Sequence, residues 1–403
     1  ILWVWNTGTL EFGHLGTATL AGKLIFLAFG IKCAFPLLHN WLQDAYPEST
    51  PTGTLYLSIF TTKMAIYALA RGFPGTEALI WIGATMTAFP IFYAVIENDL
   101  RRVLTYSLNN QLGFMVVGVG IGTQTALNGT AAYAFANIIF EGLLFMAMGA
   151  VFLRTGTCKG SELGGLYKSM PLTTAFCIVG AASISAFPFL SGFVTKSMIL
   201  DEAAAGGHTI AWLVLLFASA GVFHHSGIKI PFFAFFAHDA GFRVKEAPRP
   251  MLVAMAAMAG GCLVIGIFPA LLYSVLPFAV DYHPYTTTHV VTQYQLLLFS
   301  ALAFTFLKVT GIYPPELRSV NLDADWIYRK ALPAAIRWIA KRGGRIGERL
   351  NAVVSTQFER TYRVIYRLHG PTGVFARTWN TGAIAFWAVV GLFGFLLLYL
   401  WGR

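Results

Sequence analysis

Long apolar segments recur along almost the whole chain of 403 residues, and they constrain the fold more than any other feature of the sequence. A helix needs about 20 predominantly apolar residues to cross a lipid bilayer. Ten segments meet this requirement: 15–38, 52–71, 79–96, 103–122, 130–153, 171–202, 210–236, 251–276, 292–312 and 382–402. Short polar turns join most of them, so neighbouring helices are expected to be antiparallel. We predict an all-α polytopic membrane protein.

Composition supports a lipid environment, because charged residues make up only 11% of the chain. Soluble domains typically contain about 25%. The four cysteines show no CxxC pair and no histidine at ligand spacing, so they are interpreted as small apolar residues: Cys33, Cys158, Cys177 and Cys262. No dinucleotide or haem motif is present either. The sequence therefore predicts no cofactor and no metal, and any redox power must come from other subunits.

The loops between the segments differ in positive charge. One set carries Arg101, Arg102, Arg154, Lys159, Lys168, Arg243, Lys245 and Arg249. The alternating loops 123–129, 204–209 and 277–290 contain no lysine or arginine. The positive-inside rule places the basic loops in the cytoplasm. We therefore expect a multi-pass protein of the cell inner membrane, that is, a bacterial or archaeal cytoplasmic membrane.

The segment 325–370 has a different pattern. Its apolar residues recur at roughly helical spacing, and arginine and lysine fill many of the other positions. This pattern is typical of an interfacial amphipathic helix. With a break at Gly343–Gly344, such a helix would reach about 50–60 Å. Anionic lipid or a neighbouring subunit, not nucleic acid, is the expected partner of the basic stretch.

Two of the apolar segments look interrupted at matching places. The first contains Lys32-Cys-Ala-Phe-Pro36, and the sixth contains Ser185-Ala-Phe-Pro188. Broken helices at corresponding positions of two halves indicate an inverted-repeat transporter. The first half is incomplete here, and the chain begins at Ile1 without a methionine, so we expect an N-terminal part to precede it.

Titratable residues lie inside these apolar segments, and Glu141 is the most constrained of them. A charged group at the centre of a membrane helix costs about 2.5–3.5 kcal/mol on insertion scales, so it is kept only if it is paired, hydrated or used. The candidate proton-transfer residues are Lys32, Lys63, Glu141, Lys196, His225 and Lys229. His224 lies beside them, and His225 and Lys229 share one helix face. Two structural alternatives remain open: Lys32 could extend to an interface, and Lys63 could form a fixed ion pair with Glu141.

Several runs of the sequence resemble a known family. They are Gly30-Ile-Lys-Cys-Ala-Phe-Pro-Leu-Leu-His-Asn-Trp-Leu42, Asp44-Ala-Tyr-Pro-Glu-Ser-Thr-Pro-Thr52, Glu97-Asn-Asp-Leu-Arg-Arg-Val-Leu-Thr-Tyr-Ser107, Gln111-Leu-Gly-Phe-Met115 and Phe187-Pro-Phe-Leu-Ser-Gly-Phe-Val-Thr-Lys196. They resemble the antiporter-like membrane subunits shared by respiratory complex I, membrane-bound hydrogenases and Mrp-type cation/proton antiporters. The tail, from Leu322-Asp-Ala-Asp-Trp-Ile-Tyr328 onward, resembles the longer members, of which the distal subunit of complex I is one.

The resemblance implies a division of the chain. Residues 1–71 would end a first inverted repeat, 72–240 would form the second five-helix repeat, and 241–324 would add further membrane helices. Residues 325–378 would form the amphipathic lateral helix, and 379–403 the anchoring transmembrane helix. The chain would begin near the family's seventh helix, so the glutamate of the fifth helix would precede Ile1.

The resemblance also assigns roles to individual residues. Lys32 matches the lysine of the first broken helix, and Lys196 matches the ionisable residue of the second. Glu141 takes the place of the family's central lysine, and Asn137 takes the place of the histidine before it. Leu57 replaces another histidine, although Lys63 lies on the same helix. The loss of two groups that titrate near neutral pH puts the family's lysine/histidine mechanism in question.

Three functions follow as hypotheses. The first is a proton-translocating subunit of a multi-subunit membrane complex, working through buried lysine and glutamate residues. The second is a subunit of an Mrp-type Na⁺/H⁺ antiporter, and the third is a non-pumping scaffold. Whether the complex is a redox-driven translocase, of the NADH:quinone oxidoreductase or hydrogenase type, stays open.

Overall fold

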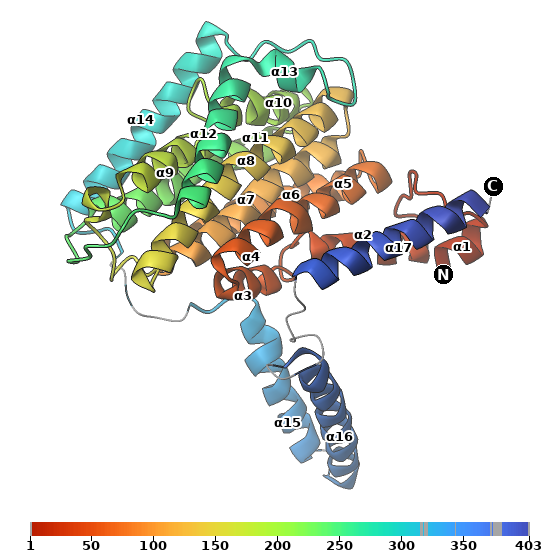
Figure 1. Ribbon diagram of the computed structural model, residues 1–403. Coiled ribbons are helices and arrows are strands. Elements are labelled where there is room, and N and C mark those ends of the chain that lie inside the picture. Colours follow the sequence, from red (N-terminus) through yellow and green to blue (C-terminus); the bar gives the residue numbers. More distant parts are fainter. Residues whose placement is uncertain are drawn as a thin grey trace. The chain divides into compact units, whose positions relative to one another are not determined.

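A computed structural model describes residues 2–314, 317, 321–342, 344–370, 373 and 381–401, and Figure 1 shows its course. The chain divides into two compact units, Ile1–Ala324 and Asp325–Arg403. Across the described ranges the regular structure is helical, with no β-strand and one isolated bridge between Asp99 and Lys159. This agrees with the all-α prediction.

The first unit contains most of the helices. Their bounds are α1 (Leu2–Thr7), α2 (Leu20–Lys32), α3 (Asn40–Glu48), α4 (Pro51–Tyr56), η1 (Leu57–Thr61), α5 (Thr62–Gly72), α6 (Glu77–Ile96), α7 (Leu100–Ile121), α8 (Gln124–Thr155), η2 (Leu166–Lys168), α9 (Pro171–Ile184), α10 (Ser191–Ala205), α11 (Thr209–Val222), η3 (Phe223–Lys229), η4 (Phe232–Phe236), α12 (Arg249–Ile267), α13 (Pro269–Tyr273) and α14 (Thr287–Val309).

Helices α7 and α8 form the centre of this unit. Helix α8 contacts α7, α9, α10 and α12, and Figure 1 shows α6, α7 and α8 running side by side. Both central helices have strong local ends. The Asp99 carboxylate accepts the first amides of α7, the Thr123 hydroxyl caps α8, and Gly122 and Gly156 end the two helices in the left-handed conformation. Almost every residue of α7 is buried, so its side chains face other helices and not lipid.

Six helices in the described ranges are long and apolar enough to cross a membrane, judged by length and composition alone: Glu77–Ile96, Gln124–Thr155, Thr209–Phe236, Arg249–Ile267, Thr287–Val309 and Gly382–Leu400. The predicted segments 15–38 and 171–202 are not continuous helices. Helix α2 stops at Lys32, and α9 and α10 are separated by residues 185–190. The predicted interruptions are therefore present.

Both breaks have the same backbone geometry. At the first, the Phe35 amide donates to the Gly30 carbonyl (3.0 Å), and Ala34 is left-handed with φ of 61°. At the second, the Phe187 amide donates to the Ala182 carbonyl (3.0 Å), and Ala186 has φ of 57°. This is a Schellman ending, in which glycine normally occupies the left-handed position.

A π-helical segment follows each break further along the chain: η1 comes after α3 and α4, and η3 comes after α10 and α11. Segment η1 precedes Lys63, and η3 contains His224, His225 and Lys229. The second break lies against its π segment, since Gly227 of η3 packs directly on the Ser185 hydroxyl. At the first break, buried Cys33 is in electrostatic range of Lys63, which lies in α5 just after η1. π-Bulges widen a helix locally and concentrate at functional sites. Of the titratable residues, His224, His225 and Lys229 lie in such a segment, and Lys63 lies two residues after another.

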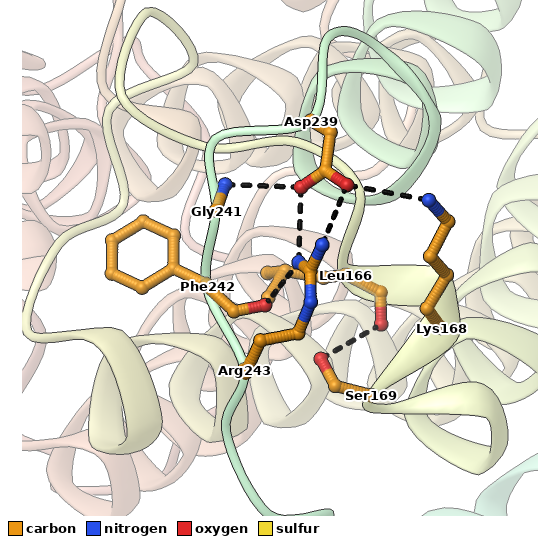
Figure 2. Close-up of polar contacts among 7 residues, drawn as sticks. All are labelled: Leu166, Lys168, Ser169, Asp239, Gly241, Phe242 and Arg243. Atoms are coloured by element: carbon orange, nitrogen blue, oxygen red, sulfur yellow. Dashed lines mark hydrogen bonds and ion pairs between the residues drawn. The ribbon is translucent and has the colours of Figure 1, made fainter.

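On the side of the basic loops, polar contacts join distant segments, as Figure 2 shows. The exposed Asp239 carboxylate accepts from Arg243 (2.8 and 3.0 Å), from Lys168 (3.2 Å) and from the Gly241 amide (3.0 Å). The hydrogen bonds from Arg243 hold the pKa of Asp239 below its usual range. These contacts tie the loop after η4 to η2.

On the opposite side, residues in or beside the three loops without lysine or arginine contact one another, and we call this side the Lys/Arg-poor face. The Thr123 hydroxyl donates to Glu202 (2.6 Å), and the Tyr282 hydroxyl donates to Asp201 (2.7 Å). The Asn128 side-chain amide also forms hydrogen bonds with the backbone carbonyl and amide of Phe278. The loop pairing agrees with the alternating charge of the sequence.

The second unit contains η5 (Ile327–Ala331), α15 (Leu332–Arg342), α16 (Gly344–His369) and α17 (Thr381–Trp401). Helix α15 ends at Arg342 and α16 begins at Gly344, in agreement with the break predicted at Gly343–Gly344, but the predicted extent of about 50–60 Å along one line is wrong. Helices α15 and α16 are separate and contact each other, and α16, with 26 residues, spans about 39 Å. Most described apolar side chains of both helices remain exposed, and sequence periodicity does not reveal that the two helices lie against each other.

Candidate functional site

Helix α8 presents three polar side chains in one stripe, at positions 133, 137 and 141. Four-residue spacing places Tyr133, Asn137 and Glu141 on one helix face. Glu141 is completely buried, and its Oε2 accepts from Asn137 Nδ2 at 3.0 Å. Glu141 Oε1 and Asn137 Oδ1 have no hydrogen-bond partner among the described residues. Glu141 thus lies in the middle of the bundle, as its place in the sequence predicts.

Lys63 lies opposite, on α5, and is buried. Its ammonium donates to the Ser58 carbonyl of η1 at 2.8 Å. Lys63 and Glu141 act on each other electrostatically, yet no ion pair within 4.0 Å joins them in the described part of the chain. The two groups are neighbours without being locked together, which is the arrangement that transfer between them requires.

Lys196 on α10 is buried, and its ammonium lies 4.1 Å from the centre of the Phe114 ring. A cation over an aromatic face is stabilised by the ring quadrupole. Its Nζ has no hydrogen-bond partner among the residues described. The Phe114 ring also meets the Tyr133 ring edge to face, with centroids 6.1 Å apart. Phe114 therefore separates Lys196 from the α8 stripe.

His225 and Lys229, which the sequence predicts on one helix face, have different surroundings in the structure. Lys229 donates to the carbonyls of Ala94 (3.1 Å), Val95 (2.7 Å) and Glu97 (2.6 Å), at the carboxyl end of α6. A cation there satisfies carbonyls that the helix leaves open. Lys229 is thus a structural cap, and its predicted transfer role loses its support.

His225 is buried, and its Nδ1 lies 2.8 Å from the Ser226 hydroxyl, which donates to the Ser107 hydroxyl at 2.8 Å. His225 Nε2 has no hydrogen-bond partner within the described ranges. Lys196 is one of the charged groups that act on His225. The histidine therefore continues the site beyond Lys196.

Sequence reasoning missed the uncharged polar residues of α7. The Tyr133 hydroxyl donates to Gln111 Oε1, and Gln111 Nε2 donates to Asn110 Oδ1 at 3.3 Å. Asn109 is also buried, with both amide atoms unpaired among the described residues. The signal was present as the run Ser107-Leu-Asn-Asn-Gln111 inside an apolar segment. Sequence analysis singled out the charged residues in apolar segments, but buried uncharged polar groups also need hydrogen-bond partners.

Lys32 does not join this site. It is the last residue of α2, and its side chain is exposed. The prediction that it is buried with the other titratable residues is not met in the described chain, and its exposure fits the alternative that Lys32 extends to an interface. Its neighbour Cys33 is buried instead, so the helix ends with the lysine turned outward.

The buried groups form a series across the bundle that the Phe114 ring interrupts before Lys196, and we call this series the polar row: Lys63, Glu141, Tyr133, Gln111, Lys196 and His225. Glu141 acts electrostatically on Tyr133, as Lys196 does on His225. Four of the row's six members come from positions that the sequence singled out. Buried polar atoms almost always find partners, and ordered water supplies them where protein does not. The unpaired atoms of Glu141, Lys196 and His225 therefore mark places for internal water.

Comparison with known proteins shows to which protein family the chain is related. The model of the family described as NADH:quinone oxidoreductase/Mrp antiporter, transmembrane, matches residues 1–224, more than half of the sequence. The match includes every member of the polar row except His225.

Curated relatives cover the same region. The chain is 28% identical over 250 residues to a Na⁺/H⁺ antiporter subunit of Bacillus subtilis (strain 168), covering 60% of this chain and 49% of that protein. It is 29% identical over 314 residues to NADH-ubiquinone oxidoreductase chain 5 of Hippopotamus amphibius, covering 74% and 50%. It is 27% identical over 304 residues to hydrogenase-4 component B of Escherichia coli (strain K12), covering 65% and 45%. The chain thus spans about half the length of these relatives.

Solved structures share the fold. The chain is similar to a chain of the Mrp complex from Dietzia sp. DQ12-45-1b, with a TM-score of 0.62, 23% identity and coverage of 67% and 62% of the two chains. It is similar to a chain of respiratory complex I from Thermus thermophilus, with a TM-score of 0.59, 25% identity and coverage of 67% and 62%. A chain of an archaeal membrane-bound sulfane sulfur reductase matches 93% of this chain, with a TM-score of 0.62 and 20% identity. The family model, the curated relatives and the shared fold agree, and the chain belongs to the NADH:quinone oxidoreductase/Mrp antiporter transmembrane family.

Proposed function

We propose that this chain is a proton-translocating, antiporter-like subunit of a multi-subunit complex in the cell inner membrane. One observation carries the proposal: titratable groups from α5, α8, α10 and η3 converge in the bundle interior without being neutralised by fixed ion pairs in the described part of the chain. Lys63, Glu141 and Lys196 each have a proton to give or accept, and each lies near a neighbour of the row.

The chemistry of the row is proton transfer through side chains and water. Glu141 takes or gives a proton at Oε1, the oxygen that Asn137 leaves free. Lys63 is the partner charge on one side. On the other side lie Tyr133 and Gln111, and the Phe114 ring separates them from Lys196. Transfer proceeds by transient protonation of Glu141 and the two lysines, so the replacement of the family's lysine by glutamate keeps a proton carrier in the row.

Sodium is the alternative ion, since one relative is a Na⁺/H⁺ antiporter subunit. Sodium needs several oxygen ligands, and Glu141 is the one carboxylate in the polar row. No group of three or more His, Cys, Asp or Glu side chains suited to a metal occurs among the described residues. The row therefore favours protons. Transport that continues in sodium-free medium is expected, and an absolute sodium requirement would contradict the proton proposal.

The direct test is Glu141→Gln in the assembled complex, reconstituted in proteoliposomes. Glutamine keeps the size and the hydrogen bond to Asn137 but carries no titratable proton. We expect loss of proton translocation while the complex remains assembled. Glu141→Lys restores the residue type of the family, and we expect it to recover part of the activity.

Glu97→Gln is the matched control. Glu97 is also a buried glutamate, but its carboxylate accepts from the backbone amides of Asn98 and Asp99 and from Asn321, away from the row. Translocation should therefore survive Glu97→Gln. Wild-type pumping by Glu141→Gln would reject the proposal and favour a scaffold, and equal loss in both variants would show a general sensitivity to buried charge.

A further inference from the structure

Helix α14 contacts the second helix break through one glutamine. Gln293 Nε2 donates to the Ser185 carbonyl at 3.1 Å. Ser185 is buried at the C-cap of α9, where a helix leaves carbonyls without an internal donor. At the first break, by contrast, the Trp41 indole of α3 donates to the Ile31 carbonyl at 2.9 Å. The first break thus receives its donor from the helix that directly follows it, whereas the second receives one from a distant helix.

The second break also packs against η3, the π segment that contains His225. Gly227 of η3 lies so close to the break that a Cβ atom on this glycine would overlap the Ser185 hydroxyl oxygen. Because protein interiors are close-packed, a contact this short means that the break and η3 cannot shift independently. His225 is only two residues from Gly227, so its position depends on where the break is held.

Helix α14 contacts the beginning of η3 as well. Ser300 Oγ donates to the Ala220 carbonyl at 2.9 Å, three residues before η3 begins. The Phe304 ring meets the His224 ring edge to face, with centroids 5.3 Å apart. Spacings of seven and four residues place Gln293, Ser300 and Phe304 on one face of α14. This face therefore reaches η3 both directly and through the second break.

We propose that Gln293 is a positioning residue for His225. By holding the Ser185 carbonyl, it fixes the break against which η3 packs, and His225 keeps its position relative to Lys196. Gln293 transfers no proton itself, because its amide does not titrate. The proposal rests on the proposed function for its purpose, since His225 and Lys196 are members of the polar row.

A displaced η3 changes the electrostatic surroundings of His225. The charged or titratable groups that act on His225 in the described chain are Lys196, His224 and Lys229. His224 and Lys229 belong to η3 and would move with His225, whereas Lys196 belongs to α10. A shift of η3 therefore alters chiefly the interaction between His225 and Lys196. The loss of Gln293 should then change how translocation depends on pH, and not only its rate.

The test compares Gln293→Met with Gln295→Met in the assembled complex. Methionine has a similar length but donates no hydrogen bond, and Gln295 is an exposed glutamine on the same helix. Amide hydrogen exchange of residues 223–229 reports whether η3 is held. We expect exchange there to become roughly fivefold faster in Gln293→Met, because one hydrogen bond is lost, and to stay unchanged in Gln295→Met.

The second measurement is the pH profile of proton translocation in proteoliposomes. We expect Gln293→Met to shift the midpoint of this profile by about half a pH unit or more, and Gln295→Met to leave it in place. Gly227→Ala pushes the break and η3 apart from the other side of their contact, so it should produce both effects as well. A folding defect in one of the two variants therefore does not decide the result.

A fall in rate by the same factor at every pH would overturn the positioning role and leave Gln293 a purely structural donor. Unchanged exchange in Gln293→Met, or equal acceleration in Gln295→Met, would overturn the hold of α14 on η3. Hydrogen exchange does not depend on transport. A wild-type complex that translocates no protons would reject the proposed function, while exchange would still decide whether Gln293 holds η3.

Discussion

At the scale of single residues, two buried lysines in neighbouring helices serve different purposes. Lys229 donates to three carbonyls at the end of α6, whereas Lys196 faces an aromatic ring and has no hydrogen-bond partner in the described ranges. Residue type and burial are the same, so only the surrounding acceptors distinguish a structural cation from one that can exchange its proton.

Methionine substitutions test this difference, since methionine fills a similar volume without a charge. Lys229→Met leaves buried carbonyls without donors, and we expect about 3 kcal/mol of destabilisation. Lys196→Met leaves no acceptor unpaired, so stability should hold while proton translocation is lost. Thermal unfolding of the purified complex and pumping in proteoliposomes measure the two effects. The assignment fails if Lys229→Met is as stable as the wild type, or if Lys196→Met still pumps.

A second residue-scale prediction concerns Asp323, whose carboxylate contacts His39 (3.1 Å) and the Tyr106 hydroxyl (2.9 Å). Burial raises the pKa of Asp323, but the contacts from His39 and its other partners lower it further, so the pKa lies below the usual 3.8. A depressed carboxyl pKa stabilises the fold above the usual value, and the contribution is lost as pH falls through the folded value.

We therefore expect amide hydrogen exchange in residues 321–324 to be slow and unchanged between pH 7 and pH 5, after correction for intrinsic rates. Protection should fall only below about pH 4. Asp323→Asn should weaken protection at pH 7 and remove this pH dependence. Loss of protection already at pH 5 in the wild type would contradict the role of Asp323.

At the scale of elements, the sequence allowed the helix breaks to be predicted because Pro36 and Pro188 stand in otherwise apolar runs. The sequence did not show which backbone conformation ends the helix at each break. Alanine, not glycine, occupies the left-handed position at Ala34 and Ala186. An alanine there carries a steric cost of about 1–2 kcal/mol, which the surrounding packing must offset. The π segments η1 and η3 were not predicted either, since they depend on tertiary contacts.

Glycine at these positions should relieve the cost without moving the break. We expect Ala186→Gly to raise the stability of the bundle by about 1 kcal/mol, less the entropy that glycine loses on folding. The matched control is Ala181→Gly, inside α9, which should lower stability by about 1 kcal/mol. Thermal unfolding of the two variants measures the contrast. A destabilising Ala186→Gly would mean that the left-handed conformation is not a source of strain.

At the scale of the whole molecule, the chain consists of a polytopic unit and a C-terminal unit that begins at Asp325. Segment order and loop charge were enough to predict the bundle and its two faces. Burial was not predictable: Lys32 lies in an apolar run but is exposed, and the polar part of α7 lies in the centre. The packing of α15 on α16 also escaped prediction, because amphipathic periodicity fits a free surface helix and a paired one equally well.

The division into units predicts that the chain can be shortened after the first unit without unfolding that unit. A chain ending at Ala324 keeps the contacts of Asn321 and Asp323 with the bundle, so it should fold and remain in the membrane. We expect it to lose stable association with the other subunits, because the amphipathic helices and α17 are missing. Co-purification of partner subunits at full occupancy with the truncated chain would show that the second unit does not brace the complex.

The two helix breaks also have a consequence for biogenesis. Helices α2 and α9 contain 13 and 14 residues and extend only about 20 Å, which is less than the roughly 30 Å of the hydrocarbon layer. Neither α2 nor α9 alone can cross the hydrocarbon layer when it leaves the ribosome. Each must wait for the chain beyond its break, α3 or α10, before its open end is shielded from lipid. Insertion of the described helices is therefore not a strict sequence of single spans, and at both helix breaks synthesis and folding must be coordinated.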